Sequence, residues 1–230
     1  MGVRRTITRG VGAKLAPQLA ELAPGLTTAF VREALNRAID GVGPLPPAAR
    51  AAEKQLAEQH GDVDKAIGEV IENNVRFAGL QGFVTNLGGL ATATVAIPTN
   101  ITGLALLQCR MIAGIAHLRG HDLADPRVRN AILACLLGQD QIEKLLKKRS
   151  LPAPPMALAT APVHDPALDS MLSTEVAAEL ITRVAGKRLA TTAGRRIPVM
   201  GGVVGAGADA VATWRVGRYA ARELLPRTRR

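Results

Sequence analysis

The sequence predicts an all-α fold, in which a compact multi-helix domain surrounds a central apolar helical hairpin. Apolar residues recur at helical spacing, and Val, Ile and Thr do not alternate with polar residues as they would in a half-buried strand. Aromatic residues are only 2% of the chain, and the 47% apolar fraction comes mainly from Ala, Leu, Val and Ile, beside 23 Gly. Because short side chains let helices approach closely, this composition favours tight helix packing.

Prolines, glycines and aspartates mark the expected helix boundaries in the first third of the chain. Residues 1–44 are predicted to form helices interrupted by prolines, with one apolar stripe that ends before Gly41. The proline pair at 46–47 is expected to open the next helix, and Asp62 to cap the one that follows. We therefore divide the chain into an N-terminal helical segment, 1–44, and a main helical domain, 45–230.

Residues 77–118 form an apolar block whose only formal charge is Arg110. Pro98 lacks an amide proton, so we expect two helices of about 21 residues each, joined at 97–100. Three interpretations of this hairpin remain open: a transmembrane hairpin, a buried pair of core helices, and a hairpin that holds or inserts into lipid. Its glycines and polar residues disfavour the first interpretation, whereas its small residues suit the other two.

Two aspartates followed by proline, Asp125 and Asp165, mark helix starts in the second half of the chain. A Pro-rich loop is expected at about 150–163, and a polar basic connector at 187–196. Pro198 then opens a long helix to about residue 225. This helix is small and apolar at first and becomes amphipathic and basic in its second half.

The net charge of +10 is concentrated near the C-terminus, where Asp209 and Glu223 are the only acids after Arg183. This positive field predicts an anionic partner. Cys109 and Cys135 lie in apolar surroundings and are expected to be small buried hydrophobes. The N-terminus lacks the continuous apolar stretch of a signal peptide, so we expect a cytoplasmic protein that associates peripherally with membrane.

Two short motifs resemble binding sites but lack the required context. The run Gly205-Ala-Gly-Ala-Asp-Ala has the outline of a dinucleotide-binding loop, but Pro198 has already begun a helix and no strand precedes it. His117 and His121 are four residues apart, yet Gly120 lies between them and no other Cys or His completes a metal site. We expect no catalysis, cofactor or metal, and the sequence assigns no role to Asp209 or to these histidines.

The predicted site is an apolar cavity between small-residue helices, next to a basic surface that docks on anionic lipid. The cavity candidates are apolar residues of the hairpin and the last helix: Phe83, Leu87, Leu90, Val95, Leu104, Leu107, Met111 and Val203. The headgroup candidates are Arg110, Arg215, Arg218, Arg222 and Arg227. The glycines expected to allow close helix packing are Gly82, Gly88, Gly89, Gly201 and Gly205.

Two of these assignments have simpler alternatives. Arg110 either reaches water, pairs with an acid such as Glu69 or Glu72, or meets a lipid phosphate. The basic face of the last helix is either solvated or held at a membrane surface. Trp214 and Tyr219 on the same helix favour the membrane surface, because amphipathic aromatic side chains suit the interface.

Several runs of residues resemble the EcsC protein family. They are, in chain order, DVDKAI at 62–67, GLQGFVTNLGG at 79–89, AIPTN at 96–100, QCRMIAGIA at 108–116, GHDLADPRVR at 120–129 and IPVMGGVVGA at 197–206. The resemblance spans about residues 45–225. The family is named for a gene beside an ABC-type exporter, so the resemblance implies an accessory protein at the membrane and supplies no catalytic residues. Asp209 and His121 depart from the family pattern, where Asn and an aromatic residue are expected.

Three functions are therefore considered. The first is a non-enzymatic protein that binds anionic lipid or a membrane surface and holds an acyl chain in an apolar hollow. The second is an adaptor for a membrane transporter or another protein, which predicts a solid core and an exposed apolar patch. The third is a basic nucleic-acid binder. It is disfavoured because the sequence has no recognition-helix signature and no aromatic stacking platform.

Overall fold

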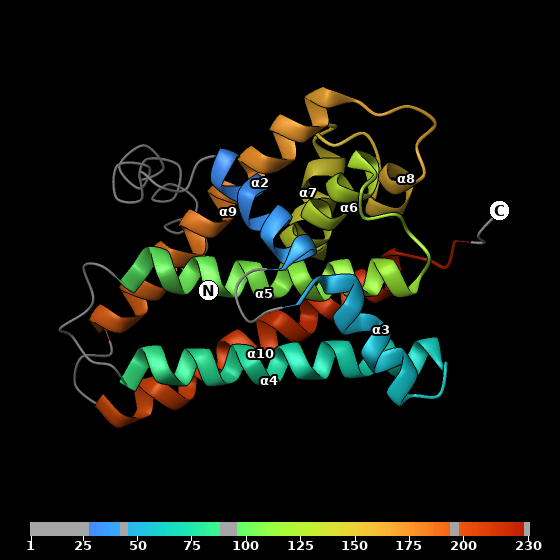
Figure 1. Ribbon diagram of the computed structural model, residues 1–230. Coiled ribbons are helices and arrows are strands. Elements are labelled where there is room, and N and C mark those ends of the chain that lie inside the picture. Colours follow the sequence, from blue (N-terminus) through green and yellow to red (C-terminus); the bar gives the residue numbers. More distant parts are fainter. Residues whose placement is uncertain (1–27, 42–45, 88–95, 194–197, 228–230) are drawn as a thin grey trace, which may run out of the picture.

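The computed structural model describes the backbone of residues 28–41, 46–87, 96–193 and 198–227, and their side chains outside 80–102 and 184–206. Every regular element in these ranges is an α-helix (Figure 1), which confirms the predicted fold class. The helices are α2 (Thr28–Asp40), α3 (Ala48–Glu58), α4 (Val63–Leu87), α5 (Ala96–Leu118), α6 (Pro126–Leu137), α7 (Gln139–Lys147), α8 (Pro155–Ala159), α9 (Pro166–Ala193) and α10 (Pro198–Glu223).

Aspartate caps begin three of these helices where the sequence predicts them. The Asp125 carboxylate accepts a hydrogen bond from the Arg127 amide at 2.9 Å, and Asp62 and Asp165 accept equivalent bonds at the starts of α4 and α9. Each bond satisfies an amide that has no partner within the helix. Gly138 ends α6 with φ of 82°, a conformation that favours glycine.

Two predicted boundaries are wrong. Pro98 does not separate two helices, because α5 already begins at Ala96 and contains Pro98 in its first turn. First-turn amides have no acceptor within the helix, so proline costs little there. The polar connector expected at 187–196 is also shorter than predicted, since α9 continues to Ala193. Lys and Arg are good helix formers, so a polar sequence did not require an end to the helix.

Helix α5 lies at the centre of the molecule and contacts α2, α3, α4, α6, α9 and α10. Its segment from Met111 to Ala116 is buried, as are both free cysteines, Cys109 and Cys135. The most extensive packing joins α10 to α4, and these two helices run in opposite directions (Figure 1). The last helix therefore packs against both helices that contain the predicted hairpin.

Two glycines that the sequence did not single out lie at contacts between described helices. A Cβ atom at Gly217 of α10 would lie 2.9 Å from Met111 Sδ and 3.0 Å from Ile71 Cγ1. A Cβ atom at Gly114 of α5 would meet Ala52 and Val70 at 3.5 Å, which is ordinary contact. The predicted packing glycines lie where no surroundings are described, either within helices at Gly82, Gly201 and Gly205, or outside the described residues at Gly88 and Gly89.

Helix α2 shares the hydrophobic core of the main domain. Its buried residues include Val31, Leu35 and Ile39, and it packs on α5 and α9. The predicted boundary between residues 44 and 45 lies outside the described residues. The Pro-rich stretch at 150–163 contains α8, which packs on α6.

Among the described residues, no helix combines the length and the apolar character needed to cross a membrane.

Candidate functional site

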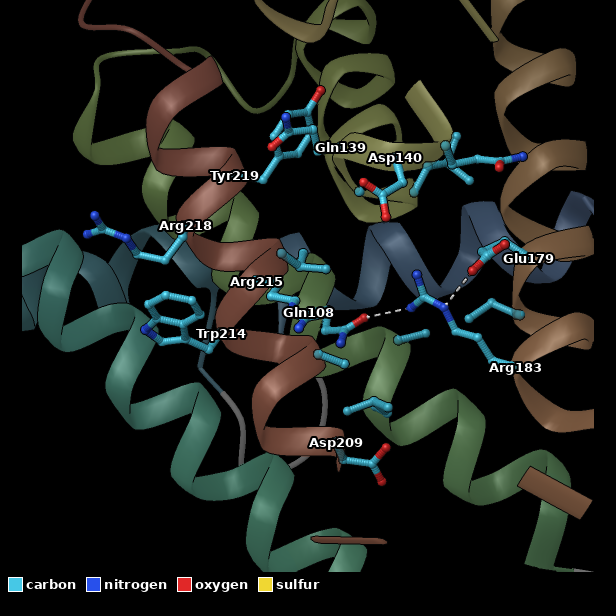
Figure 2. Close-up of a pocket in the computed structure, with 18 of the residues that line it drawn as sticks. Gln108, Gln139, Asp140, Glu179, Arg183, Asp209, Trp214, Arg215, Arg218 and Tyr219 are labelled. Carbon is cyan, nitrogen blue, oxygen red and sulfur yellow. Dashed lines mark hydrogen bonds and ion pairs between the residues drawn. The ribbon is translucent and has the colours of Figure 1, made fainter. Parts of the chain in front are cut away.

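A pocket of about 930 Å³ lies between α5, the start of α7, α9 and α10 (Figure 2). Its apolar lining comes from Leu104, Ala105, Leu137, Leu180, Ala208, Ala212, Trp214, Val216 and Tyr219. Its charged lining comes from Lys144, Arg183, Arg215, Arg218, Arg222, Asp140, Glu179 and Asp209. Cationic groups therefore outnumber carboxylates around a partly apolar space.

A hydrogen-bonded chain of polar side chains forms one wall of this pocket. Gln108 is completely buried, and its Nε2 donates to Thr213 Oγ1 of α10 at 3.1 Å. Its Oε1 accepts a longer bond of 3.4 Å from Arg183 Nη1 of α9, and Arg183 Nε donates to Glu179 Oε1 at 3.0 Å. These bonds satisfy a polar side chain that would otherwise be costly to bury within apolar α5. The bonds of Arg183 join α5 and α9 beside the pocket (Figure 2), and the bond to Thr213 adds α10.

Four exposed cations line the pocket, and we call them the cationic rim: Lys144, Arg215, Arg218 and Arg222. Arg215, Arg218 and Arg222 are spaced three and four residues apart, so they share one exposed face of α10. Arg222 donates to Gln139 Oε1 of α7 at 3.0 Å. Lys144, Arg215 and Arg218 form no ion pair with any residue in the described ranges. Their charges are therefore available to an anion that enters the pocket.

Two buried residues of α10, Asp209 and Tyr219, also line the pocket. Asp209 is only 5% exposed and lines the pocket from the same helix as Arg215 and Arg218 (Figure 2). Tyr219 is also buried, and burial together with the Glu223 carboxylate raises its pKa above the ordinary value. The phenol therefore stays protonated near neutral pH and can act as a neutral hydrogen-bond donor.

Some of the predicted lipid-contacting residues meet in this pocket and others do not. Leu104 lies there together with Arg215, Arg218 and Arg222. Leu107 is half-buried outside the lining, and Met111 is completely buried beneath α10. The side chains of Phe83, Leu87 and Val203 are not described, and Leu90 and Val95 lie outside the described residues.

The two remaining headgroup candidates lie away from the pocket. Arg110 donates to the Pro46 carbonyl, and it forms no ion pair with Glu69, Glu72 or any other described residue. Burial lowers the pKa of Arg110, although a guanidinium remains charged at neutral pH. Arg227 follows α10, and its backbone amide donates to the Arg119 carbonyl at 2.7 Å.

The sequence missed Gln108, Lys144 and Arg183 as residues of this site. One available signal was Gln108 itself, a polar side chain on a helix whose buried face is otherwise apolar. Lys144 and Arg183 gave no such signal, because basic residues on exposed helix faces are common.

The two histidines of the predicted i, i+4 pair do not converge on a common ligand. His117 Nε2 lies 2.9 Å from Glu53 Oε1 of α3, whereas His121 Nε2 donates to the Leu225 carbonyl at 3.0 Å. Within the described ranges, no group of three or more His, Cys, Asp or Glu side chains could hold a metal ion.

Comparison with known proteins identifies the family of the chain. The family model described as the EcsC protein family matches residues 15–228. No curated protein and no solved structure matches the chain. Because the family match extends over nearly the whole sequence, the chain belongs to the EcsC protein family.

Proposed function

We propose that this protein binds anionic lipid at a membrane surface and takes the headgroup into the pocket between α5, α7, α9 and α10. The observation that supports this proposal best is the cationic rim, where Lys144, Arg215 and Arg218 have no described acidic partner. A bound anion interacts most favourably with cations that have no acidic partner. Guanidinium groups can also donate two hydrogen bonds to the oxygens of a phosphate. The mechanism is binding, with no turnover.

The pocket also has the size and polarity of a headgroup site. Its volume of about 930 Å³ falls within the range of roughly 300–1,000 Å³ that is usual for small-molecule sites. Leu104, Leu137 and Leu180 line it beside the polar groups. Such a lining suits the glycerol backbone and first acyl carbons of a lipid, while the rim arginines hold the phosphate.

The exposed aromatic residue beside the rim is consistent with a membrane surface. Trp214 is 51% exposed and lies one turn before Arg218 on the same face of α10. Tryptophan favours the region between headgroups and acyl chains, where its ring is in apolar surroundings and its N–H can find an acceptor.

A protein-adaptor function remains the second candidate, and one observation favours it. Phe77 on α4 is 59% exposed, and exposed aromatic residues are frequent at protein interfaces. The solid packing around Met111 and Ile112 is also what an adaptor would need.

Flotation of the protein with vesicles tests the lipid proposal. The wild-type protein should float with vesicles that contain phosphatidylglycerol and should remain unbound with pure phosphatidylcholine. The variant R215Q/R218Q/R222Q should bind anionic vesicles at least about tenfold more weakly, because each lysine or arginine near such a surface contributes about 1 kcal/mol. Native mass spectrometry of the purified protein would identify any lipid that it retains.

A matched control removes the same charge elsewhere. Lys147, Lys148 and Arg149 at the end of α7 are exposed and do not line the pocket. The variant K147Q/K148Q/R149Q should therefore bind much more tightly than the α10 variant. Equal losses in the two variants would indicate binding through net charge alone. Absence of flotation for the wild-type protein would overturn the lipid proposal in favour of an adaptor.

A further inference from the structure

We infer that the end of the molecule where α4 terminates and α5 and α10 begin enters one leaflet of an anionic bilayer. This inference rests on the proposed lipid-binding function and adds the membrane-facing surface and its depth. The three helix ends lie together at one side of the molecule, and the C-terminal end of α9 lies with them (Figure 1). We call this region the membrane-facing end. It comprises residues 80–87, 96–104, 184–193 and 198–208 of the described helices.

Acidic residues are absent from the sequence of the membrane-facing end. No Asp or Glu occurs from Asn73 to His121 or from Leu180 to Ala208, two stretches that the fold brings together. The α4 and α5 parts carry no formal charge at all, and the α9 part contributes Lys187 and Arg188. An uncharged core flanked by cations is the pattern expected of a surface that enters anionic lipid. A protein partner would not require the exclusion of carboxylates.

The lengths of the uncharged segments indicate insertion into one leaflet only. From Pro198 to Ala208, α10 rises by roughly 15 Å, about half the roughly 30 Å hydrocarbon core. The α4 segment from residue 80 to Leu87 is shorter still. Asp209 follows immediately on α10, and a buried carboxylate is costly to carry into hydrocarbon. The insertion should therefore stop near this residue.

The exposed face of α10 changes from apolar to basic with increasing distance from the membrane-facing end, as expected if that end enters the bilayer. Val211 and Trp214 are each 51% exposed and lie nearer the membrane-facing end, and Arg215, Arg218 and Arg222 follow. With the membrane-facing end in the acyl region, Val211 and Trp214 lie at the interface and the arginines at headgroup level. The pocket, whose lining includes Leu104 and Ala208, then opens next to the headgroups.

Depth-dependent fluorescence quenching tests the orientation directly. The chain has a single tryptophan, Trp214, so W214F provides a background for new probes, and flotation of W214F first establishes that this background binds the vesicles. In that background, F83W places a probe in the membrane-facing end of α4. The control L225W places one beyond α10, where Leu225 is 54% exposed. With phosphatidylcholine–phosphatidylglycerol vesicles that carry acyl-chain bromines, the F83W probe should lose most of its fluorescence and the L225W probe almost none.

A pair of matched valine substitutions provides a second readout. Val211 and Val163 are both exposed, and Val163 belongs to the segment between α8 and α9. This segment lies on the side of the molecule away from the membrane-facing end (Figure 1). V211E should weaken vesicle partitioning by about tenfold or more, because a carboxylate near acyl chains is unfavourable and anionic headgroups repel it. V163E should change partitioning by less than about twofold.

The possible results separate this inference from the proposed function. If the wild-type protein floats with anionic vesicles but both tryptophan probes are quenched equally, the orientation is wrong and lipid binding stands. Equal partitioning of V211E and V163E would lead to the same conclusion. If the wild-type protein does not bind vesicles, both proposals fail together. A circular dichroism spectrum like that of the wild type excludes misfolding of a variant as the cause.

Discussion

Gly217 has the closest packing of any helical glycine for which the structure describes the surroundings. It lies where α10 crosses α4 and α5, and a Cβ atom there would be 2.9 Å from Met111 Sδ and within 3.1 Å of two Ile71 carbons. Real Cβ atoms do not approach heavy atoms this closely, so either side chain would have to move. Met111 is completely buried, so its side chain has little space in which to adopt another rotamer.

The substitution G217A should therefore destabilise the protein by about 1–3 kcal/mol, the usual cost of overpacking a core. The shift in the urea midpoint at unchanged slope measures this loss. The matched control is G68A on α4, where a Cβ atom would meet no described atom within 4 Å. There, the better helix propensity of alanine should stabilise the protein by about 0.5–1 kcal/mol. A stabilising G217A would show that the α4–α10 contact is looser than the distances indicate.

At the scale of elements, the segment after α10 is held against the turn between α5 and α6. The Arg227 amide donates to the Arg119 carbonyl at 2.7 Å, and His121 Nε2 donates to the Leu225 carbonyl at 3.0 Å. Gly120, with φ of 82°, allows this contact, since a Cβ atom there would lie 2.9 Å from the Arg227 carbonyl oxygen. The glycine is thus required both by its backbone conformation and by the close approach of the chain.

His121 should make this contact sensitive to acid. No described residue forms a hydrogen bond with its buried Nδ1. Burial lowers the pKa of the His121 imidazole below its ordinary value of 6.5; the hydrogen bond to Leu225 opposes this shift, and the Arg227 charge adds to it. Below about pH 6.5, His121 is therefore protonated more readily in the unfolded chain than in the folded protein. Neutral His121 therefore makes its full contribution to the free energy of unfolding above about pH 6.5. This contribution decreases as the pH falls from there toward the pKa of His121 in the folded protein.

The measurement that checks this prediction is the difference in unfolding free energy between wild type and H121Q, followed from pH 7.5 to pH 5. Because a glutamine does not titrate, the advantage of the wild-type protein should shrink as the pH decreases. Other acid-sensitive groups are common to both proteins and cancel in the difference. A difference that is constant across this range would contradict the prediction.

At the scale of the whole molecule, Asp169 at the start of α9 joins helices that are distant in sequence. Its carboxylate accepts hydrogen bonds from Asn130 of α6 at 2.8 Å and from His164 at 2.9 Å, and it pairs with Arg32 of α2 at 3.0 Å. Burial raises the pKa of Asp169, but these three partners outweigh it and hold the pKa below its ordinary value. Together with the shared core, this contact predicts that α2 unfolds with the rest of the protein.

The substitution D169N should lower the free energy of unfolding by about 1–3 kcal/mol, because it weakens charge-assisted bonds to partly buried groups. The exposed pair between Glu33 and Arg37 on α2 offers a control, and E33Q should change stability by less than about 1 kcal/mol. Circular dichroism and intrinsic fluorescence should report one coincident transition in urea. A separate early transition in D169N would show that α2 is an independent unit.

The sequence alone determined the fold class and most helix starts, and the physical reason is local. The Asp caps at Asp62, Asp125 and Asp165 act within one turn of their own residues, so their signals can be read without knowing the fold. The family resemblance likewise depends only on the order of residues. The extent of α9 was missed because polar composition does not by itself end a helix.

Only the tertiary structure decided which of the predicted residues meet. Leu104, Lys144 and Arg215 come from three helices separated by long stretches of sequence, and packing alone brings them to one pocket. The role of Gly217 was likewise hidden, because a glycine in a helix gives no sign of which side chain will face it. Local sequence determines where helices begin. Which helix faces pack together depends on burying the apolar surface of the whole chain, and this packing places the residues of the pocket.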